Sequence, residues 1–177
     1  MSTFLSKNRT ASFLSRCGVV VHMIPAVIFF LIGLWVHDAA AAEKDAADFT
    51  LPDLKGEAFT LSSLRGEIVL LKLGTTWCAS CTEQSREIEA LAPYLAENEV
   101  HVVEVYLQDT LAAVKQLQGE SPPPFSRMVV MDDGRVQRLY NVYAIPRLIL
   151  IDRAQKIEHD GSLLRRDALK KLLESSL

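Results

Sequence analysis

Two cysteines three residues apart constrain this chain more than any other feature of its sequence. Cys78 and Cys81 stand where a strand predicted over residues 68–73 gives way to a helix predicted over residues 82–97. Cysteines at this spacing face each other across one helical turn, so they can form a disulfide or a reactive dithiol. Their position at a helix start therefore predicts redox chemistry.

The two thiols are expected to have different roles. The unpaired backbone N–H groups and the dipole at a helix N-terminus favour an anion over a neutral thiol, so Cys78 should be the more acidic cysteine. Cys81 lies one turn further along and should be more shielded from solvent. A shielded thiol is suited to resolving a mixed disulfide rather than to starting one.

A structural zinc site is the alternative use of two cysteines at this spacing, and it needs four ligands in a tetrahedral arrangement. The sequence offers few others. Cys17 lies in an apolar N-terminal segment, and His101 and His159 are isolated rather than paired at ligand spacing. We therefore predict no metal site and prefer the redox interpretation.

The composition is that of one globular domain with an ordinary surface. The chain has 177 residues, of which 49% are hydrophobic, and a formal net charge of −3. It contains no internal repeat or low-complexity tract, and it is long enough to bury a core. Because it has no basic stripe, nucleic acid is excluded as a class of partner.

The N-terminal part of the chain resembles a targeting segment. Three basic residues precede residues 18–36, which carry no formal charge. This apolar run reaches the length of a membrane-spanning helix, while the alanines at 39–42 offer a cleavage site. The positive-inside rule leaves the N-terminus in the cytoplasm and directs the remainder outward.

Three regions are therefore predicted. Residues 1–42 form a signal peptide or membrane anchor, residues 43–47 form a linker, and residues 48–177 form the domain. We expect this domain to be periplasmic or otherwise extracytoplasmic and tethered to the inner membrane.

Apolar periodicity in the domain predicts alternating strands and helices after a hairpin around residues 55–57. Pro93 is predicted to kink the helix over 82–97 rather than to end it. The order is a βαβ unit, then a strand hairpin, then a helix, which predicts an α/β domain with a mixed sheet between helices. The predicted strands cover 68–73, 100–107, 128–131, 147–151 and, at the sheet edge, 156–160; the predicted helices cover 82–97, 110–118, 136–140 and 165–173.

Four segments of the domain carry a family resemblance in their order along the chain. They are Asp48-Phe49-Thr50-Leu51-Pro52-Asp53-Leu54, Leu61-Ser62-Ser63-Leu64-Arg65-Gly66, Trp77-Cys78-Ala79-Ser80-Cys81, and Tyr143-Ala144-Ile145-Pro146 followed by Leu148-Ile149-Leu150-Ile151-Asp152. Together they resemble the thioredoxin-like proteins, and among these the TlpA/ResA-like envelope thiol-disulfide oxidoreductases related to AhpC/TSA and redoxin proteins. The resemblance covers about residues 48–174 and implies a thioredoxin-like fold, with a central mixed sheet flanked by helices. The apolar run over residues 18–36 adds an N-terminal hydrophobic helix to this prediction.

The resemblance also implies a substrate-binding region. It implies a cis peptide bond between Ile145 and Pro146, and an Ile145 main chain that pairs with the substrate chain. It implies that Trp77 packs beside the dithiol and shields it, the alternative being an ordinary core aromatic. Arg147 departs from the pattern, because thioredoxins have threonine there.

Two further departures concern proton transfer. The family often has an acidic or amide residue six positions before the first cysteine, where this chain has Lys72. A buried cation there would lower the thiol pKa values, unless the lysine extends to water along the sheet edge. ResA-like members carry glutamate three positions after the second cysteine, where this chain has Gln84. Glu83 and Glu87 could substitute, the alternative being that both face solvent.

The predicted mechanism is attack by the Cys78 thiolate on a protein disulfide, followed by release through Cys81, with no cofactor. The expected partners are exported proteins, including an apocytochrome with a CxxCH haem site. An integral-membrane thiol donor is expected if the protein is a reductase. This would place it in cytochrome c maturation.

Two other functions stay open. Thr75 and Cys78 match part of the peroxiredoxin signature and suggest a thiol peroxidase, although Leu71 stands where that signature has proline. A copper carrier would use Cys78 and Cys81 with a distant histidine, although such carriers often have an extra residue between the cysteines.

Overall fold

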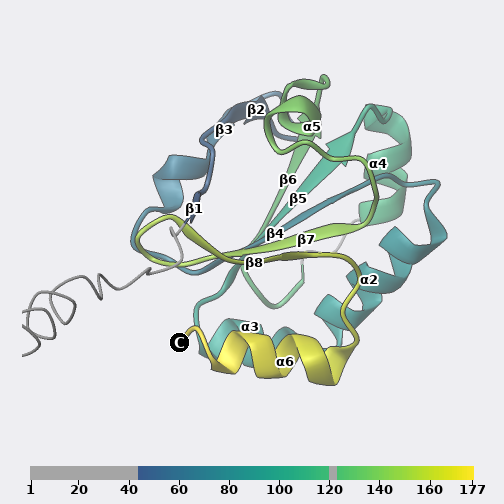
Figure 1. Cartoon of the computed structure of the whole chain (residues 1–177). Coiled ribbons are helices and arrows are strands. Elements are labelled where there is room, and N and C mark those ends of the chain that lie inside the picture. Colours follow the sequence, from purple (N-terminus) through teal and green to yellow (C-terminus); the bar gives the residue numbers. More distant parts are fainter. Residues whose placement is uncertain (1–43, 120–122) are drawn as a thin grey trace, which may run out of the picture. The chain divides into compact units, whose positions relative to one another are not determined.

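The computed structural model describes residues 44–119 and 123–177 (Figure 1). The targeting segment and N-terminal hydrophobic helix predicted within residues 1–42 lie outside the described residues. Within the described ranges, no helix is long and apolar enough to cross a membrane.

A six-stranded mixed sheet with the strand order β1-β8-β7-β4-β5-β6 forms the centre of the domain (Figure 1). Strands β4, β5 and β6 run parallel, whereas β7 and β8 are antiparallel to their neighbours. The predicted mixed sheet is therefore confirmed. The strands are β1 (Lys44–Asp45), β4 (Val69–Gly74), β5 (His101–Leu107), β6 (Arg127–Asp132), β7 (Arg147–Ile151) and β8 (Lys156–Gly161).

Strand β8 does not form the edge that the sequence predicts. The two-residue strand β1 pairs outside it, with Lys44 opposite Ile157. The residues after β1, Ala46 and Ala47, pack against the hydrophobic core. The segment interpreted as a linker therefore adds a short strand to the sheet.

The predicted hairpin is confirmed as strands β2 (Thr50–Pro52) and β3 (Ala58–Thr60), which pair antiparallel. The turn contains Gly56 at a φ of 89°, which glycine adopts without steric cost. A single 3-10 turn over Leu61–Leu64 follows.

The prediction of one kinked helix over residues 82–97 is wrong, because two helices, α2 and α3, occupy this stretch. Helix α2 ends at Glu89, and Pro93 lies in the first turn of α3. A proline is tolerated there, since the first backbone N–H groups of a helix have no partner within it. The helices are α2 (Ala79–Glu89), α3 (Ala92–Glu97), α4 (Leu111–Gln118), α5 (Arg135–Leu139) and α6 (Arg166–Glu174).

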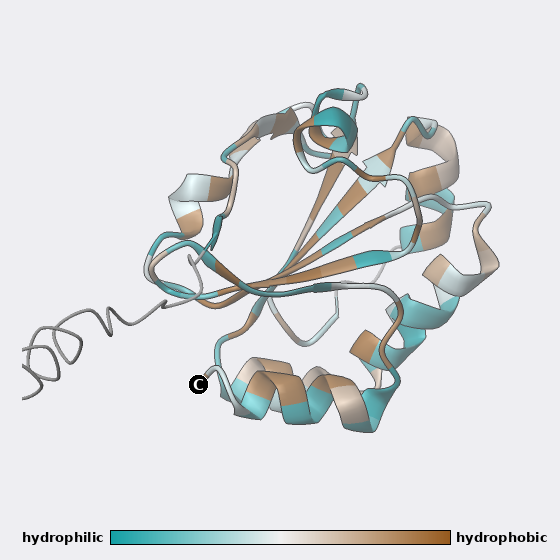
Figure 2. Cartoon of the chain, in the orientation of Figure 1, coloured by the Kyte–Doolittle hydropathy of each residue, from teal (hydrophilic) through white to brown (hydrophobic). Residues whose placement is uncertain are grey.

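The core lies on both faces of strand β4, as expected for a central strand. Leu71 joins a cluster with the hairpin and α5, whereas Leu70 joins a cluster with α2, α3 and α6. Hydrophobic residues dominate the central strands in Figure 2, while α2 and α6 mix hydrophobic and hydrophilic residues. Because strand side chains alternate, Lys72 and Gly74 share the face of Leu70, which α2 covers.

Candidate functional site

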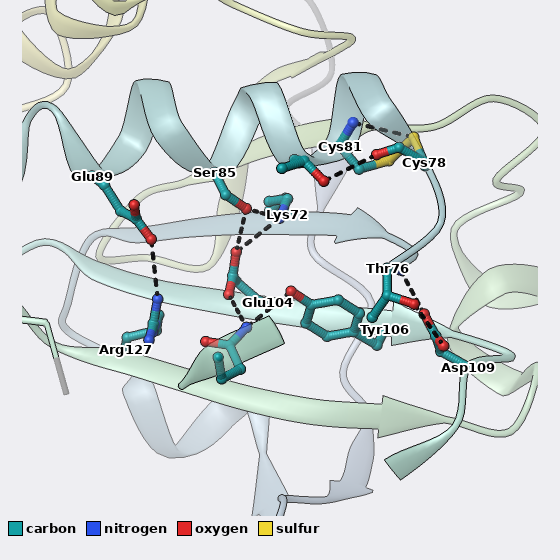
Figure 3. Close-up of polar contacts among 12 residues, drawn as sticks. Lys72, Thr76, Cys78, Cys81, Ser85, Glu89, Glu104, Tyr106, Asp109 and Arg127 are labelled. Carbon is teal, nitrogen blue, oxygen red and sulfur yellow. Dashed lines mark hydrogen bonds and ion pairs between the residues drawn. A yellow bond between two sulfur atoms is a disulfide. The ribbon is translucent and has the colours of Figure 1, made fainter. Parts of the chain in front are cut away.

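Cys78 and Cys81 form a disulfide at the N-terminus of α2 (Figure 3). Cys78 is the N-cap residue, and its Sγ accepts a hydrogen bond from the Cys81 backbone N–H at 3.1 Å. Cys78 is partly exposed and Cys81 is buried. Backbone N–H groups at a helix start stabilise a thiolate, so the geometry favours an acidic, accessible Cys78 in front of a shielded Cys81.

The turn that leads into Cys78 is fixed by a carboxylate from the neighbouring strand. Asp109 Oδ2 accepts a hydrogen bond from the Thr76 backbone N–H at 2.6 Å, and Asp109 Oδ1 accepts one from Thr76 Oγ1 at 3.1 Å (Figure 3). Asp109 follows the end of β5, which is parallel to β4. The loops at the carboxyl ends of both strands are thus joined beside the disulfide.

Trp77 is 75% exposed, so its interpretation as a core aromatic is wrong. Its shielding of the dithiol stays a prediction. The Thr75 side chain, in contrast to that of Trp77, is buried. Its Oγ1 has no hydrogen-bond partner among the residues that the structure describes.

The Ile145–Pro146 peptide bond is cis, as the resemblance implies. Strand β7 begins directly afterwards, with Arg147 paired opposite Leu73 near the end of β4. Strand β4 leads into the turn before Cys78, so the cis proline and the disulfide lie at the same end of the two paired strands.

Gly74 leaves room for the buried cysteine. A Cβ added at Gly74 would stand 3.0 Å from Cys81 Sγ, 3.1 Å from Cys81 Cβ and 4.0 Å from Lys72 Cε. Distances of 3.0 to 3.1 Å are tighter than ordinary van der Waals contact. The absence of a side chain at Gly74 therefore permits Cys81 to pack directly on the strand.

Replacing Gly74 with alanine is expected to displace Cys81 or the start of α2, because neither the strand nor the disulfide can yield easily. Overpacking of this kind typically costs about 1–3 kcal/mol. Urea unfolding of the oxidised variant and of the wild type measures the difference in free energy of unfolding. A variant as stable as the wild type would contradict the tight contact.

Lys72 is buried, with 3% of its side chain exposed, and it forms an ion pair beneath α2. Its Nζ donates to Glu104 Oε1 at 2.8 Å and also to Ser85 Oγ, and Gln118 Nε2 donates to Glu104 Oε2 at 3.0 Å (Figure 3). Lys72 lies on a central strand rather than at the sheet edge. The interpretation in which it extends to water is therefore wrong.

The ion pair holds Glu104 in its charged form. Burial raises the pKa of Glu104, but the charge of Lys72 and the hydrogen bonds from Lys72 and Gln118 outweigh burial and bring this pKa below its ordinary value. Tyr106 lies next to the pair, with its ring centroid 5.7 Å from Lys72 Nζ. Burial raises the pKa of the Tyr106 phenol, which keeps it neutral.

Three of the four proton-transfer candidates tie α2 to the segment before α6. Glu83 and Glu87 both pair with Arg165, the latter at 3.4 Å, on the outer face of α2. Gln84 is buried, and its Oε1 accepts the Leu164 backbone N–H at 2.7 Å. Each of these side chains has a structural partner. Lys72 lies under the same helix and donates to Ser85, one turn after Cys81.

Comparison with known proteins identifies the family of this chain. Residues 42–160 match the model of the AhpC/TSA family. The chain belongs to the AhpC/TSA family.

Two relatives of this AhpC/TSA protein are thiol-disulfide enzymes. A thiol-disulfide oxidoreductase ResA of Bacillus thuringiensis (strain Al Hakam) is 30% identical over 156 residues, which cover 86% of this chain and 87% of the relative. A thiol:disulfide interchange protein DsbE of Pseudomonas aeruginosa is 31% identical over 146 residues, covering 78% of each chain. The protein is thus a thiol-disulfide oxidoreductase.

A solved structure supports the thioredoxin-like fold. It is the crystal structure of a thiol:disulfide interchange protein, a thioredoxin family protein from Chlorobium tepidum TLS, with a TM-score of 0.64. The match covers 77% of this chain and 97% of that structure at 19% identity, so it bears on the fold alone.

Sequence reasoning missed two acidic residues of this AhpC/TSA site, Glu104 and Asp109. Glu104 is the single charge inside an apolar strand, as Lys72 is in its own strand, and the parallel register places the two opposite each other. That pair of isolated, opposite charges was the available signal. Asp109 has no comparable signal, because its partners are a backbone N–H and an uncharged hydroxyl of Thr76.

Proposed function

We propose that this thiol-disulfide oxidoreductase exchanges disulfides with exported proteins through Cys78 and Cys81. The observation that supports this most strongly is the arrangement at the start of α2. Cys78 is partly exposed and its sulfur accepts a backbone N–H, while Cys81 is buried. The accessible sulfur suits attack, and the buried one suits resolution.

In the reducing direction, the Cys78 thiolate attacks one sulfur of a substrate disulfide. The other substrate sulfur leaves with the bonding electron pair and takes up a proton, and Cys78 is left in a mixed disulfide. The Cys81 thiolate then attacks the Cys78 sulfur and releases the second substrate thiol. The substrate gains two electrons, and the enzyme dithiol becomes the disulfide; substrate oxidation is the reverse sequence.

Cys81 must lose its proton before it attacks, and we assign Lys72 to assist this loss. A cation close to a buried thiol favours the thiolate and lowers its pKa. Glu104 balances the charge of Lys72 and keeps it beneath α2. A pocket of about 240 Å³ is lined by Ser85, Glu104 and Gln118 among other residues, and it brings solvent to the partners of Lys72.

The substrate chain would bind beside Pro146. Ile145 supplies the main-chain groups for strand addition, and the exposed Trp77 ring supplies an apolar contact. In the part of the chain that the structure describes, no hydrogen bond involves the main chain of Ile145. Its N–H and C=O groups are therefore available to an extended polypeptide.

The proposed location is the periplasmic side of the inner membrane, with residues 1–42 as signal peptide or anchor and residues 48–177 as the domain. The order of basic residues before an apolar run supports export. Among exported proteins, an apocytochrome with a CxxCH haem site is a suitable substrate, because it presents two neighbouring cysteines. A membrane thiol donor would then supply electrons, and no cofactor enters the exchange.

The proposal is tested by giving the reduced protein two oxidants, insulin and hydrogen peroxide. It should reduce the disulfides of insulin with dithiothreitol as the electron source, at a rate well above that of dithiothreitol alone. Hydrogen peroxide should oxidise it no faster than it oxidises a free thiol. Failure to reduce insulin or any other disulfide protein would contradict the proposal.

A thiol peroxidase is the second candidate, and the buried, unpartnered Oγ1 of Thr75 is the observation in its favour. Rapid peroxide consumption that is lost in a Thr75→Val variant would support it. Copper transport is distinguished by metal analysis of the reduced protein, since a carrier would bind nearly one copper per chain. The described residues contain no group of three or more His, Cys, Asp or Glu side chains that could hold a metal ion.

A further inference from the structure

We propose that Arg147 is a positioning residue that shapes the segment receiving the protein substrate, an inference that rests on the proposed function. Arg147 directly follows the cis Pro146 and is the first residue of β7. Its guanidinium group reaches two separate parts of the chain, strand β8 and the end of α5. The resulting contacts close the base of the segment over residues 142–146.

The first contact joins Arg147 to strand β8. Arg147 Nε donates to Asp160 Oδ1 at 2.6 Å, and Arg147 Nη2 donates to Asp160 Oδ2 at 2.6 Å. The two side chains are only 20% and 26% exposed. This parallel pair of hydrogen bonds uses the planar geometry of guanidinium and fixes its orientation, which a lysine ammonium could not do.

The remaining edge of the guanidinium faces the end of α5. Arg147 Nη1 donates to the carbonyl oxygen of Tyr140 at 2.5 Å and to that of Asn141 at 3.0 Å. The last carbonyl groups of a helix lack partners within the helix, so Arg147 satisfies two acceptors where α5 ends. Asn141 has a φ of 52°, and the chain turns there. Arg147 thus bonds across the start and the end of the segment.

The middle of the segment over residues 142–146 is exposed to solvent. Tyr143 is 93% exposed, and Ala144 is also exposed. Within the described ranges, the main chain of Tyr143, Ala144 and Ile145 makes no hydrogen bond. Val142 and Ile145 pack against the hydrophobic core on either side of this exposed part, and the Val142 N–H donates to the Gln137 carbonyl oxygen at 2.9 Å. The segment is therefore held on both sides of Tyr143 and Ala144.

A second anchor lies just before the segment. Tyr140 is buried, and its hydroxyl donates to the carbonyl oxygen of Ala47 at 2.7 Å. A main chain that is fixed in shape but unpaired can bind an extended polypeptide without first losing conformational freedom. Arg147 would therefore matter for polypeptide disulfides, which pair with this main chain, and not for small disulfides, which react with Cys78 alone.

The experiment compares Arg147→Lys with the wild type on two substrates. With insulin as the disulfide protein, KM should rise roughly tenfold, because misplaced docking groups weaken substrate positioning. The second-order rate constant for reaction of the reduced enzyme with 5,5′-dithiobis(2-nitrobenzoate) should stay within about twofold of the wild type. Arg135→Lys is the matched control, since Arg135 forms an exposed ion pair with Asp133 away from the segment.

Asp160→Asn is the second variant. It allows the effect on KM for insulin to be measured if Arg147→Lys folds poorly. It leaves Arg147 in place but removes the charge that orients it, so KM for insulin should rise by a smaller factor. Equal losses with both substrates, or no loss with insulin, would overturn the inference. If the wild type itself fails to reduce insulin and other disulfide proteins, the proposed function fails instead.

Discussion

Replacing Cys78 with serine is expected to abolish disulfide exchange, whereas replacing Cys81 with serine is expected to leave a protein that captures its substrates. Loss of the attacking sulfur should reduce the rate of insulin reduction by at least about a thousandfold. Loss of Cys81 stops the reaction after the first step, because no second thiol releases the mixed disulfide. Non-reducing electrophoresis and mass spectrometry of envelope extracts identify the trapped partners.

Cys17→Ser is the control for these two variants, because it makes the same substitution at the third cysteine of the chain. It should keep the wild-type rate. Trapping through Cys81 in a Cys78→Ser variant, at a level equal to trapping through Cys78, would reverse the assigned roles. The absence of any covalent partner in the Cys81→Ser variant would argue against exchange with envelope proteins.

Replacing Glu104 with glutamine is expected to cause the largest loss of stability among the substitutions considered. The change leaves the Lys72 ammonium buried without its counter-ion, and breaking a buried pair in this way costs about 3–5 kcal/mol. Urea unfolding of the oxidised protein measures the loss. Lys72→Met combined with Glu104→Gln should recover much of it, because the double variant contains no unpaired buried charge.

Glu104 should also contribute to acid unfolding. Its pKa in the folded protein is lowered from an ordinary value of 4.5. The stabilisation is therefore present above about pH 4.5 and is lost as the pH falls toward the lowered folded-state pKa. The Glu104→Gln variant should lack this part of the pH dependence.

The exposed Glu89, which pairs with Arg127 at 3.6 Å, provides the matched control for Glu104. Glu89→Gln should change the free energy of unfolding by no more than about 0.5 kcal/mol, since exposed ion pairs contribute little. If Glu104→Gln lowers the free energy of unfolding no more than Glu89→Gln does, the buried Lys72–Glu104 pair does not stabilise the fold as proposed.

Local patterns predicted most of the sheet because its central strands are apolar on both faces. The strand predicted over residues 68–73 corresponds to β4 within one residue at each end. The same reasoning failed at Pro93, because apolar spacing cannot distinguish a kink from the first turn of a new helix. The choice depends on how α3 packs against the sheet, which is a tertiary effect.

The part of the candidate site formed by residues close together in the sequence was predictable. Cys78 and Cys81 are neighbours in the sequence, so their pairing needs only the helix start between them. The partner of Lys72 is different, because Glu104 is 32 residues away and meets it through strand register. The exposure of Trp77 likewise depends on the turn held by Asp109, which local propensity does not encode.

The pH dependence of cysteine alkylation in the reduced protein tests the central claim most directly. Iodoacetamide is added over a range of pH, and mass spectrometry follows Cys78 and Cys81 separately. We expect Cys78 to be modified first, with a midpoint below about pH 8.5, the ordinary pKa of a cysteine thiol. Cys81 should stay unmodified until the protein unfolds. Equal rates at both cysteines, or a midpoint for Cys78 at or above that value, would contradict an activated Cys78 with a shielded partner.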